Sequence, residues 1–482
     1  MRKRFEAQLL IGQLPIEKTP IPKKTRDSLA ALVTALREIY IQPEWNTQVF
    51  EILEKKILSK HNKTGRPGMN LWQIFVLAQV RFCLNISYDR LHMMANYDKL
   101  IRQLMGVETD FGFEKIEFEY QNILDNISLL NDEMVRELND VIVSFGHSVF
   151  KKKEEEALCL KTDSFVVESN VHFPTDYNLL WDCARKSLDT VVYFAEKYSE
   201  ISGWRKVKNW YGELKSMMRI LGKANASGGK NKDKRVKKAA QQYLKKANLL
   251  VKKIEESQYS FPQVDAIDVA HHIALIRYIE LLKKHIDLVA RRILQGEQIP
   301  HEEKMFSIFE TYTEWLTKGK QHPNVELGKN VAITSDQYHL IIDYKIMENQ
   351  TDNEIVTELK EKITSKYTVF SWSFDKGFWS KLNKVELQEK VEKVILPKKG
   401  KRNQIEEEEE TDKLYRKLRH KHSAVESNIN ELEHRGLDRC RDRGYEHFKR
   451  YVGLAVCTYN LRRIGKFLMD EYASQEAAKK AA

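Results

Sequence analysis

Hydrophobic residues follow two different spacings along the chain, and the changes between them predict where helices and strands lie. From Asp27 to about Lys153 the apolar residues recur at helical spacing, and Asn70 with Gln73 forms an N-cap before an apolar helix. Residues 157–170 read ALCLKTDSFVVESN, which is typical of a buried strand with one acidic residue, Asp163, near its middle. A carboxylate in such a strand is costly unless a partner or a metal ion stabilises it.

Helical spacing returns after this strand. Residues 232–253 form a strongly basic helix that follows a flexible break, ASGGKN. The next helix is predicted over Val264–Leu294. Its apolar stripe is carried at helical spacing by Val269, Ile273, Ile276, Ile279, Leu282 and Ile286.

Strand spacing dominates from about residue 325. The stretch VELGKNVAITSDQYHLIIDYKIM predicts two adjacent strands, FSWSFD predicts a strand that ends at Asp375, and KVEKVIL predicts another. Glu406–Glu410 is expected to be an acidic, exposed loop, and the chain from Thr411 to Tyr472 is helical. This order of strands and helices, with a long helical insertion after the first strand, predicts a mixed α/β fold.

Composition narrows the class of protein and of partner. The 482 residues are 42% hydrophobic and 31% charged, with a net charge of +11, which favours a polyanionic partner. The five cysteines are scattered without a CxxC pair, so neither a disulfide framework nor a zinc site is expected. This cysteine usage indicates a reducing compartment, and we expect the protein in the cytoplasm. No apolar run reaches the ~20 residues that a membrane span needs.

Three acidic residues are candidates for a common site. Asp163 lies in the first strand, Asp375 at the end of a later strand, and Glu426 in a helix. Residues from two neighbouring strands and a flanking helix can converge, and their carboxylates would then bind Mg²⁺ or Mn²⁺. Two such ions ~4 Å apart suit phosphodiester chemistry. Spacing alone also permits a simple strand-end turn at Asp375 and an ordinary helical position for Glu426.

Three segments together resemble the catalytic blocks of insertion-sequence DDE transposases. These segments are DSFVVESNVHFPTDYNLLWD, SFDKGFWS and the long stretch that begins HSAVESNINELEHRGLDR. The resemblance covers most of the chain and is closest to ISNCY-type elements. It implies an RNase H-like catalytic domain over residues 154–176 and 320–482. A Lys-rich helical insertion over residues 177–319 would interrupt this domain, and an all-helical domain over residues 1–153, expected to bind DNA ends, would precede it.

The resemblance also implies roles for particular residues. Asp163, Asp375 and Glu426 take the catalytic positions and hold two Mg²⁺ or Mn²⁺ ions. Related families add a Tyr, an Arg and a Lys around the glutamate, whereas this chain has Arg419, His422 and Glu433 near those places.

Two groups of basic residues are candidates for DNA contact. Guanidinium groups bind phosphate bidentately, and the candidates after the glutamate are Arg435, Arg439, Arg441 and Arg443. Surface ion pairs with Asp438 and Asp442 are the alternative for these arginines. The basic helix offers Lys234, Arg235, Lys237, Lys238 and Lys245; such a run of one charge indicates nucleic-acid contact, with a solvated face as the alternative.

The function expected from these features is that of a DNA transposase. Metal-activated water would cut the phosphodiester at a transposon end, and the 3′-hydroxyl would then attack target DNA. The partners would be double-stranded DNA with terminal inverted repeats and target DNA, bound by a homodimer that is nucleoid-associated in the cytoplasm. Two alternatives stay open: an inactivated transposase that acts as a DNA-binding regulator, and a metal-dependent nuclease without strand transfer.

Overall fold

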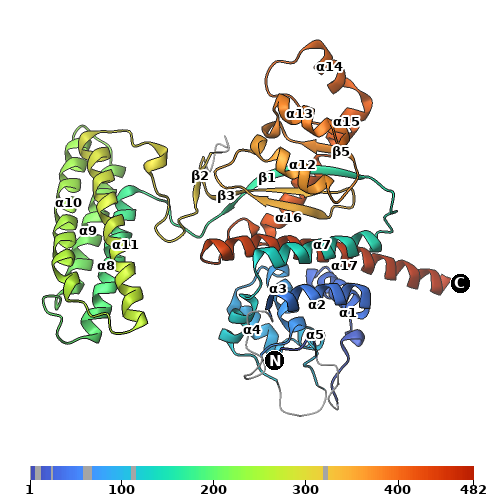
Figure 1. The fold of residues 1–482 in the computed structure, drawn as a ribbon, viewed down its shortest axis with the longest axis horizontal. Helices are drawn as coiled ribbons and strands as arrows, with labels where there is room; N and C mark the ends of the chain where they lie inside the picture. Colours follow the sequence, from blue (N-terminus) through green and yellow to red (C-terminus); the bar gives the residue numbers. More distant parts are fainter. Residues whose placement is uncertain are drawn as a thin grey trace. The chain divides into compact units, whose positions relative to one another are not determined.

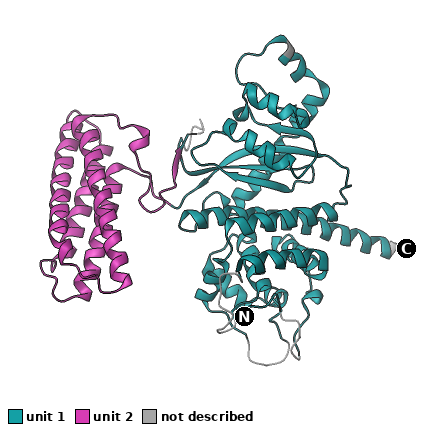
Figure 2. Ribbon diagram, viewed as in Figure 1, with its two compact units in different colours: residues 1–170, 316–482 teal, residues 171–315 magenta. Residues whose placement is uncertain are grey.

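The chain forms two compact units (Figure 2). The computed structural model describes residues 2–5, 12–22, 25–57, 68–109, 116–317 and 324–481. Unit 1 comprises Met1–Asn170 and Leu316–Ala482, and unit 2 comprises Val171–Trp315. The division into a DNA-end-binding domain, a catalytic domain and an insertion stays a prediction, because compactness alone does not test what each part does.

The first half of unit 1 is helical, as its apolar spacing predicts (Figure 1). A short 3-10 helix, η1 (Ile16–Lys18), precedes helices α1 (Ser28–Ile41), α2 (Pro43–Ile57), α3 (Leu71–Cys83), α4 (Tyr88–Tyr97), α5 (Lys99–Leu104), α6 (Tyr120–Ile127) and α7 (Asp132–Val149). The predicted cap of α3 is confirmed, since Asn70 and Gln73 form a reciprocal capping box. Every residue of α3 is buried, and α3 packs with α1 and α7 against the last helix of the chain, α17 (Tyr445–Ala481).

A curled mixed sheet forms the centre of the second half of unit 1 (Figure 1). Its strands lie in the order β4-β3-β1-β5-β6. Their bounds are β1 (Leu158–Glu168), β3 (Glu326–Ser335), β4 (Ile341–Ile346), β5 (Val369–Phe374) and β6 (Val391–Ile395), while the short β2 (Glu314–Leu316) lies at the boundary between the units. β3 is antiparallel to both β1 and β4, whereas β1, β5 and β6 run parallel. The mixed α/β prediction is confirmed.

Short helices connect and cover these strands. They are η6 (Asp352–Glu354), α12 (Val356–Thr364), η7 (Lys376–Phe378), α13 (Lys381–Gln388), α14 (Gln404–Thr411), α15 (Lys413–His420), α16 (Ser423–Leu432) and the π-helix η8 (Glu433–Leu437). The prediction of a loop at Glu406–Glu410 is wrong, because this acidic run lies in α14. Asn403 caps the helix, and Lys398 and Arg402 pair with two of its glutamates, which offsets the repulsion between like charges.

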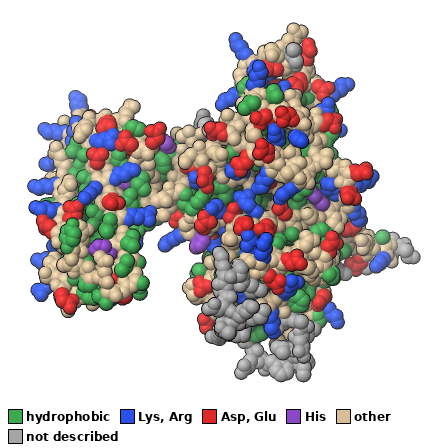
Figure 3. All heavy atoms as spheres, viewed as in Figure 1, with side chains coloured by type: hydrophobic (Ala, Val, Ile, Leu, Met, Phe, Trp, Pro, Cys, Tyr) green, Lys and Arg blue, Asp and Glu red, His purple; other side chains and the backbone are tan. Residues whose placement is uncertain are grey.

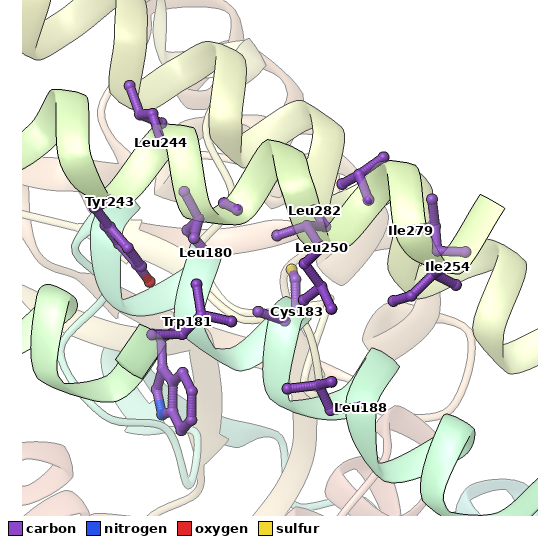
Figure 4. Packing of buried hydrophobic residues seen from close by; sticks show 14 of the residues in the cluster. Leu180, Trp181, Cys183, Leu188, Tyr243, Leu244, Leu250, Ile254, Ile279 and Leu282 are labelled. Atoms are coloured by element: carbon purple, nitrogen blue, oxygen red, sulfur yellow. The ribbon is translucent and has the colours of Figure 1, made fainter. Parts of the chain in front are cut away.

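Unit 2 is helical. It contains α8 (Asp176–Lys197), α9 (Val207–Ala226), α10 (Lys232–Ser257), η3 (Gln258–Ser260), α11 (Ala266–Val289), the π-helix η4 (Ala290–Gln295) and η5 (His301–Glu303). Figure 4 shows Leu180, Cys183 and Leu188 of α8 packing with Leu250 of α10 and Leu282 of α11. Among the described helices of the chain, none is both long and apolar enough to cross a membrane.

The stripe predicted on α11 is wrong in its first half. Ile279 and Leu282 are buried, but Val269, Ile273 and Ile276 are 39%, 63% and 43% exposed. A polar residue sets the orientation of the helix start. Asp268 is fully buried there. It accepts hydrogen bonds from the side chains of Tyr193 and Lys197 in α8 and of Tyr198, the residue that follows α8.

Candidate active site

Asp163, Asp375 and Glu426 line one open pocket of about 620 Å³ in unit 1. Two of them are neighbours because of the strand register. Thr162 of β1 pairs with Phe374 of the parallel strand β5. The residues that follow them, Asp163 and Asp375, are therefore neighbours. Helix α16 packs across β1 and β3 and supplies Glu426. Three elements that are far apart in sequence therefore converge on one place.

The pocket is strongly acidic. Besides the three predicted acids it is lined by Glu326 of β3, Asp352 of η6 and Glu433 of η8. Among the described residues that line it, none is a lysine or an arginine. Sequence reasoning did not select Glu326 or Asp352, since one is an ordinary polar residue at a strand start and the other looks like part of a helix cap.

The chemistry of the donors fits a divalent cation. Carboxylate oxygens are hard ligands, and Mg²⁺ is commonly held by only one or two carboxylates together with water and substrate phosphate. Within the described part of the chain, no group of three or more His, Cys, Asp or Glu side chains is arranged so that it could hold a metal ion by itself. If a cation binds in this pocket, its carboxylates would hold it together with substrate phosphate and water.

His422, four residues before Glu426, lies behind the end of β5. Its Nδ1 atom is 3.0 Å from the Ser373 hydroxyl, and its Nε2 atom is buried without a hydrogen-bond partner among the described residues. Burial lowers the pKa of His422 to about 4, although the nearby charge of Asp375 acts in the opposite direction. His422 is therefore neutral near pH 7 and offers no positive charge to a phosphate.

The four candidate arginines lie in different surroundings. Arg435 is half-buried, and its Nη1 atom donates to Ser28 Oγ at 3.0 Å and to the Cys83 carbonyl at 3.2 Å. Arg439, Arg441 and Arg443 are exposed. The alternative role for these arginines was surface ion pairs with Asp438 and Asp442. Asp442 pairs with Arg81 and Arg450 instead.

The basic helix of unit 2 is α10, and its five candidate residues are all exposed. The opposite side of α10 is buried and includes Ala240, Tyr243 and Leu250. Figure 3 shows Lys and Arg side chains along the left edge of unit 2, where Figure 1 places α10. Arg235 also donates to the Gly228 carbonyl at 2.7 Å, so its guanidinium closes the turn before the helix.

Comparison with known proteins identifies the domain. The family model of the transposase DDE domain matches residues 299–461, about a third of the chain. The matched segment includes Asp375 and Glu426 and lies after Asp163 in the sequence. No curated protein matches the chain, and no solved structure does. Residues 299–461 are thus similar to the transposase DDE domain, and the resemblance to insertion-sequence DDE transposases is confirmed.

Proposed function

We propose that the protein is a DNA transposase that cleaves phosphodiester bonds at transposon ends and transfers the resulting 3′-hydroxyl into target DNA. One observation carries the proposal: Asp163, Asp375 and Glu426 line the same acidic pocket. The strand order β4-β3-β1-β5-β6, with a helical insertion after β1, supports an RNase H-like assignment of the sheet.

The carboxylates of this site would bind and position the metal ions, and they do not act as nucleophiles. Asp163 lies in β1, Asp375 directly follows the neighbouring parallel strand β5, and Glu426 lies in the helix that packs on β1 and β3, so regular elements position all three. Mg²⁺ or Mn²⁺ bound there would activate the attacking oxygen and stabilise the leaving oxygen. The acidic lining keeps DNA phosphates away unless cations neutralise it, which links substrate binding at the pocket to the metal.

The basic surfaces would hold the DNA outside the pocket. The exposed lysines of α10 suit contact with phosphates, which is independent of sequence. The N-terminal helices of unit 1 are the proposed site for the terminal repeats. Two transposon ends must meet during transfer, so a homodimer on DNA is part of the proposal.

Two conservative variants test the proposal. Asp163→Asn and Glu426→Gln keep side-chain shape and remove the charge that binds the cation. Each is expected to abolish Mg²⁺-dependent cleavage of end DNA while end binding persists. Glu358→Gln is a matched control, because Glu358 lies on α12 and pairs with Lys345 at 2.7 Å, outside the pocket lining. Cleavage retained by Asp163→Asn or Glu426→Gln would rule the assignment out.

A second measurement separates transfer from cleavage. Precut transposon ends are incubated with a target plasmid and Mg²⁺, and joined products are counted by gel electrophoresis. Joined products that disappear in Glu426→Gln support a transposase. Cleavage without any joined product would identify a nuclease, and intact DNA binding without cleavage would identify a regulator.

A further inference from the structure

The carboxylate of Asp352 lies where three elements of the pocket meet. The Ser164 hydroxyl donates to Asp352 Oδ1 at 2.7 Å, and Asn330 Nδ2 donates to the same oxygen at 3.2 Å. Ser164 directly follows Asp163 in β1, and its backbone N–H donates to Asp163 Oδ1 at 2.7 Å. Asp352 is therefore one hydrogen-bonded residue away from the first predicted metal ligand.

The other oxygen of Asp352 lies against the turn that follows Asp375. A Cβ atom added to Gly377 would be 2.6 Å from Asp352 Oδ2, closer than real contacts allow. Gly377 is not among the described glycines with positive φ, so its backbone does not require glycine. A side chain at this position would therefore displace the Asp352 carboxylate from the place where it accepts from Ser164. Gly377 thus leaves space for a carboxylate that lies 25 residues earlier in the chain.

Further contacts hold both turns in place. Thr351 and Glu354 form a capping box around η6. Asn383 Nδ2 donates to the Asn353 carbonyl at 2.8 Å and to the Phe378 carbonyl at 2.9 Å, which joins η6 to η7. The position of the Asp352 carboxylate is therefore fixed from its own turn as well as by Ser164 and Asn330.

We propose that Asp352 is a positioning residue that sets the distance between the β1 segment of Asp163 and the turn of Asp375. This inference rests on the proposed function, since the two aspartates are taken as metal ligands. Oδ1 accepts from Ser164 and Asn330 while Oδ2 faces Gly377, so the carboxylate connects the segments of both aspartates and would act through these neighbours. Residues that orient metal ligands change metal affinity by about 10- to 100-fold when they are removed.

Mn²⁺ binding to the full chain with a duplex of end DNA, measured by calorimetry against the same DNA alone, tests this role, because substrate phosphate would complete the coordination. Asp352→Ala is expected to weaken Mn²⁺ binding by about 10- to 100-fold. Asp352→Asn keeps an oxygen that can accept from Ser164, and it is expected to restore binding to within about threefold of the natural protein. Unchanged binding in Asp352→Ala would overturn the proposal. Loss in Asp352→Asn as large as in Asp352→Ala would show that Asp352 is a ligand, which also overturns it.

Thermal unfolding tests the contact with Gly377 and needs neither metal nor DNA. Gly377→Ala is expected to lower the Tm in the presence of Asp352, but not in the Asp352→Ala background, where the added methyl group has space. Additive losses in the double variant would contradict the proposed contact. Gly212→Ala is the matched control, because a Cβ there meets nothing within 4 Å. Asp352→Ser creates similar space and replaces Asp352→Ala in the comparison if the alanine variant does not fold.

The two measurements also separate this inference from the proposed function. If the natural protein binds no Mn²⁺ while the unfolding experiment is non-additive, the proposed function fails and the contact between Asp352 and Gly377 stands. If the natural protein binds Mn²⁺ and cleaves DNA while Asp352→Ala does both equally well, only the positioning role fails.

Discussion

Arg81 and Asp442 form a buried bidentate ion pair. Arg81 Nη2 lies 2.6 Å from Asp442 Oδ1, and Nη1 lies 3.1 Å from Oδ2, with the side chains only 5% and 9% exposed. Arg81 belongs to α3, and Asp442 lies ten residues after the end of α16, the helix of Glu426. The pair therefore joins the N-terminal helices of unit 1 to the segment that carries the third acid of the candidate site.

Breaking this ion pair should destabilise unit 1. Asp442→Asn leaves the buried Arg81 and Arg450 without their charged partner, and a loss of about 3–5 kcal/mol in the free energy of unfolding is expected. Urea unfolding followed by circular dichroism measures it. The control is the triple variant Arg81→Met, Asp442→Leu and Arg450→Met, since Asp442 also pairs with the buried Arg450 and replacing all three charges by apolar groups is expected to cost much less. Equal losses in the single and triple variants would contradict the prediction.

The same pair predicts how stability changes in acid. Burial alone would raise the pKa of Asp442, but hydrogen bonds and the charge of Arg81 outweigh it and lower that pKa below its usual value. The folded state thus keeps Asp442 ionised where the unfolded chain already binds a proton. Its contribution is fully present above about pH 4 and is lost as the pH falls through the lowered value. In Asp442→Asn this part of the acid dependence should be missing.

His422 also predicts a loss of stability in acid, but here the cause is burial of the imidazole and not an ion pair. Its pKa is lowered to about 4 by burial, whereas the unfolded value is about 6.5. Between these values the unfolded chain binds a proton that the folded state does not, so the free energy of unfolding falls as the pH decreases from about 6.5 to 4. The imidazole chemical shift of His422 should titrate near pH 4. A midpoint near 6.5 would contradict this, and His422→Gln should flatten the pH dependence of stability.

The sequence predicts the strands of unit 1 and the place of their acids well, because both depend on local patterns. Asp163 lies within an apolar strand and Asp375 directly after another, and the register of these neighbouring parallel strands brings the two residues together. Asp352 could not be selected, since its role arises from contacts with β1, β3 and the turn at Gly377. The partner of Asp442 could not be predicted either, because Arg81 lies 361 residues away in the chain.

The orientation of α11 shows why apolar spacing alone can mislead. Its sequence permits more than one apolar stripe, and the buried Asp268 decides which stripe faces the core. Ile279→Ala, in the core, should therefore lower the free energy of unfolding by about 2–5 kcal/mol. Ile273→Ala, at an exposed position of the same helix, should change it by less than about 0.5 kcal/mol. Similar losses in these matched variants, measured by urea unfolding, would refute the observed orientation.

Arg435 and Arg443 should differ in what they contribute. Arg435 bonds to Ser28 and the Cys83 carbonyl, so Arg435→Ala should lower the free energy of unfolding by about 1–3 kcal/mol. Arg443 is exposed, so Arg443→Ala should leave stability unchanged, and if Arg443 contacts a phosphate the variant should reduce the salt dependence of DNA binding by about one unit of slope. Unfolding and binding are measured on the same preparations. An equal loss of stability in both variants would contradict this distinction.

The exposed basic face of α10 predicts a defined salt dependence of DNA binding. Each lysine that neutralises a phosphate releases a counterion, so the logarithm of the affinity falls linearly with the logarithm of the salt concentration. Replacing Lys234, Lys237 and Lys238 together by alanine should reduce that slope by up to about three units and weaken binding similarly for all DNA sequences.

Fluorescence anisotropy between roughly 50 and 200 mM salt measures this slope. Lys283→Ala is the control within unit 2, because Lys283 is already paired with Glu255 at 2.5 Å and should contribute little to the slope. Stability should not change in the triple variant, since all three lysines are exposed and the core residues of α10 lie on its other side. A slope that stays the same in the triple variant would mean that α10 presents a solvated charged face and that DNA is held elsewhere on the protein.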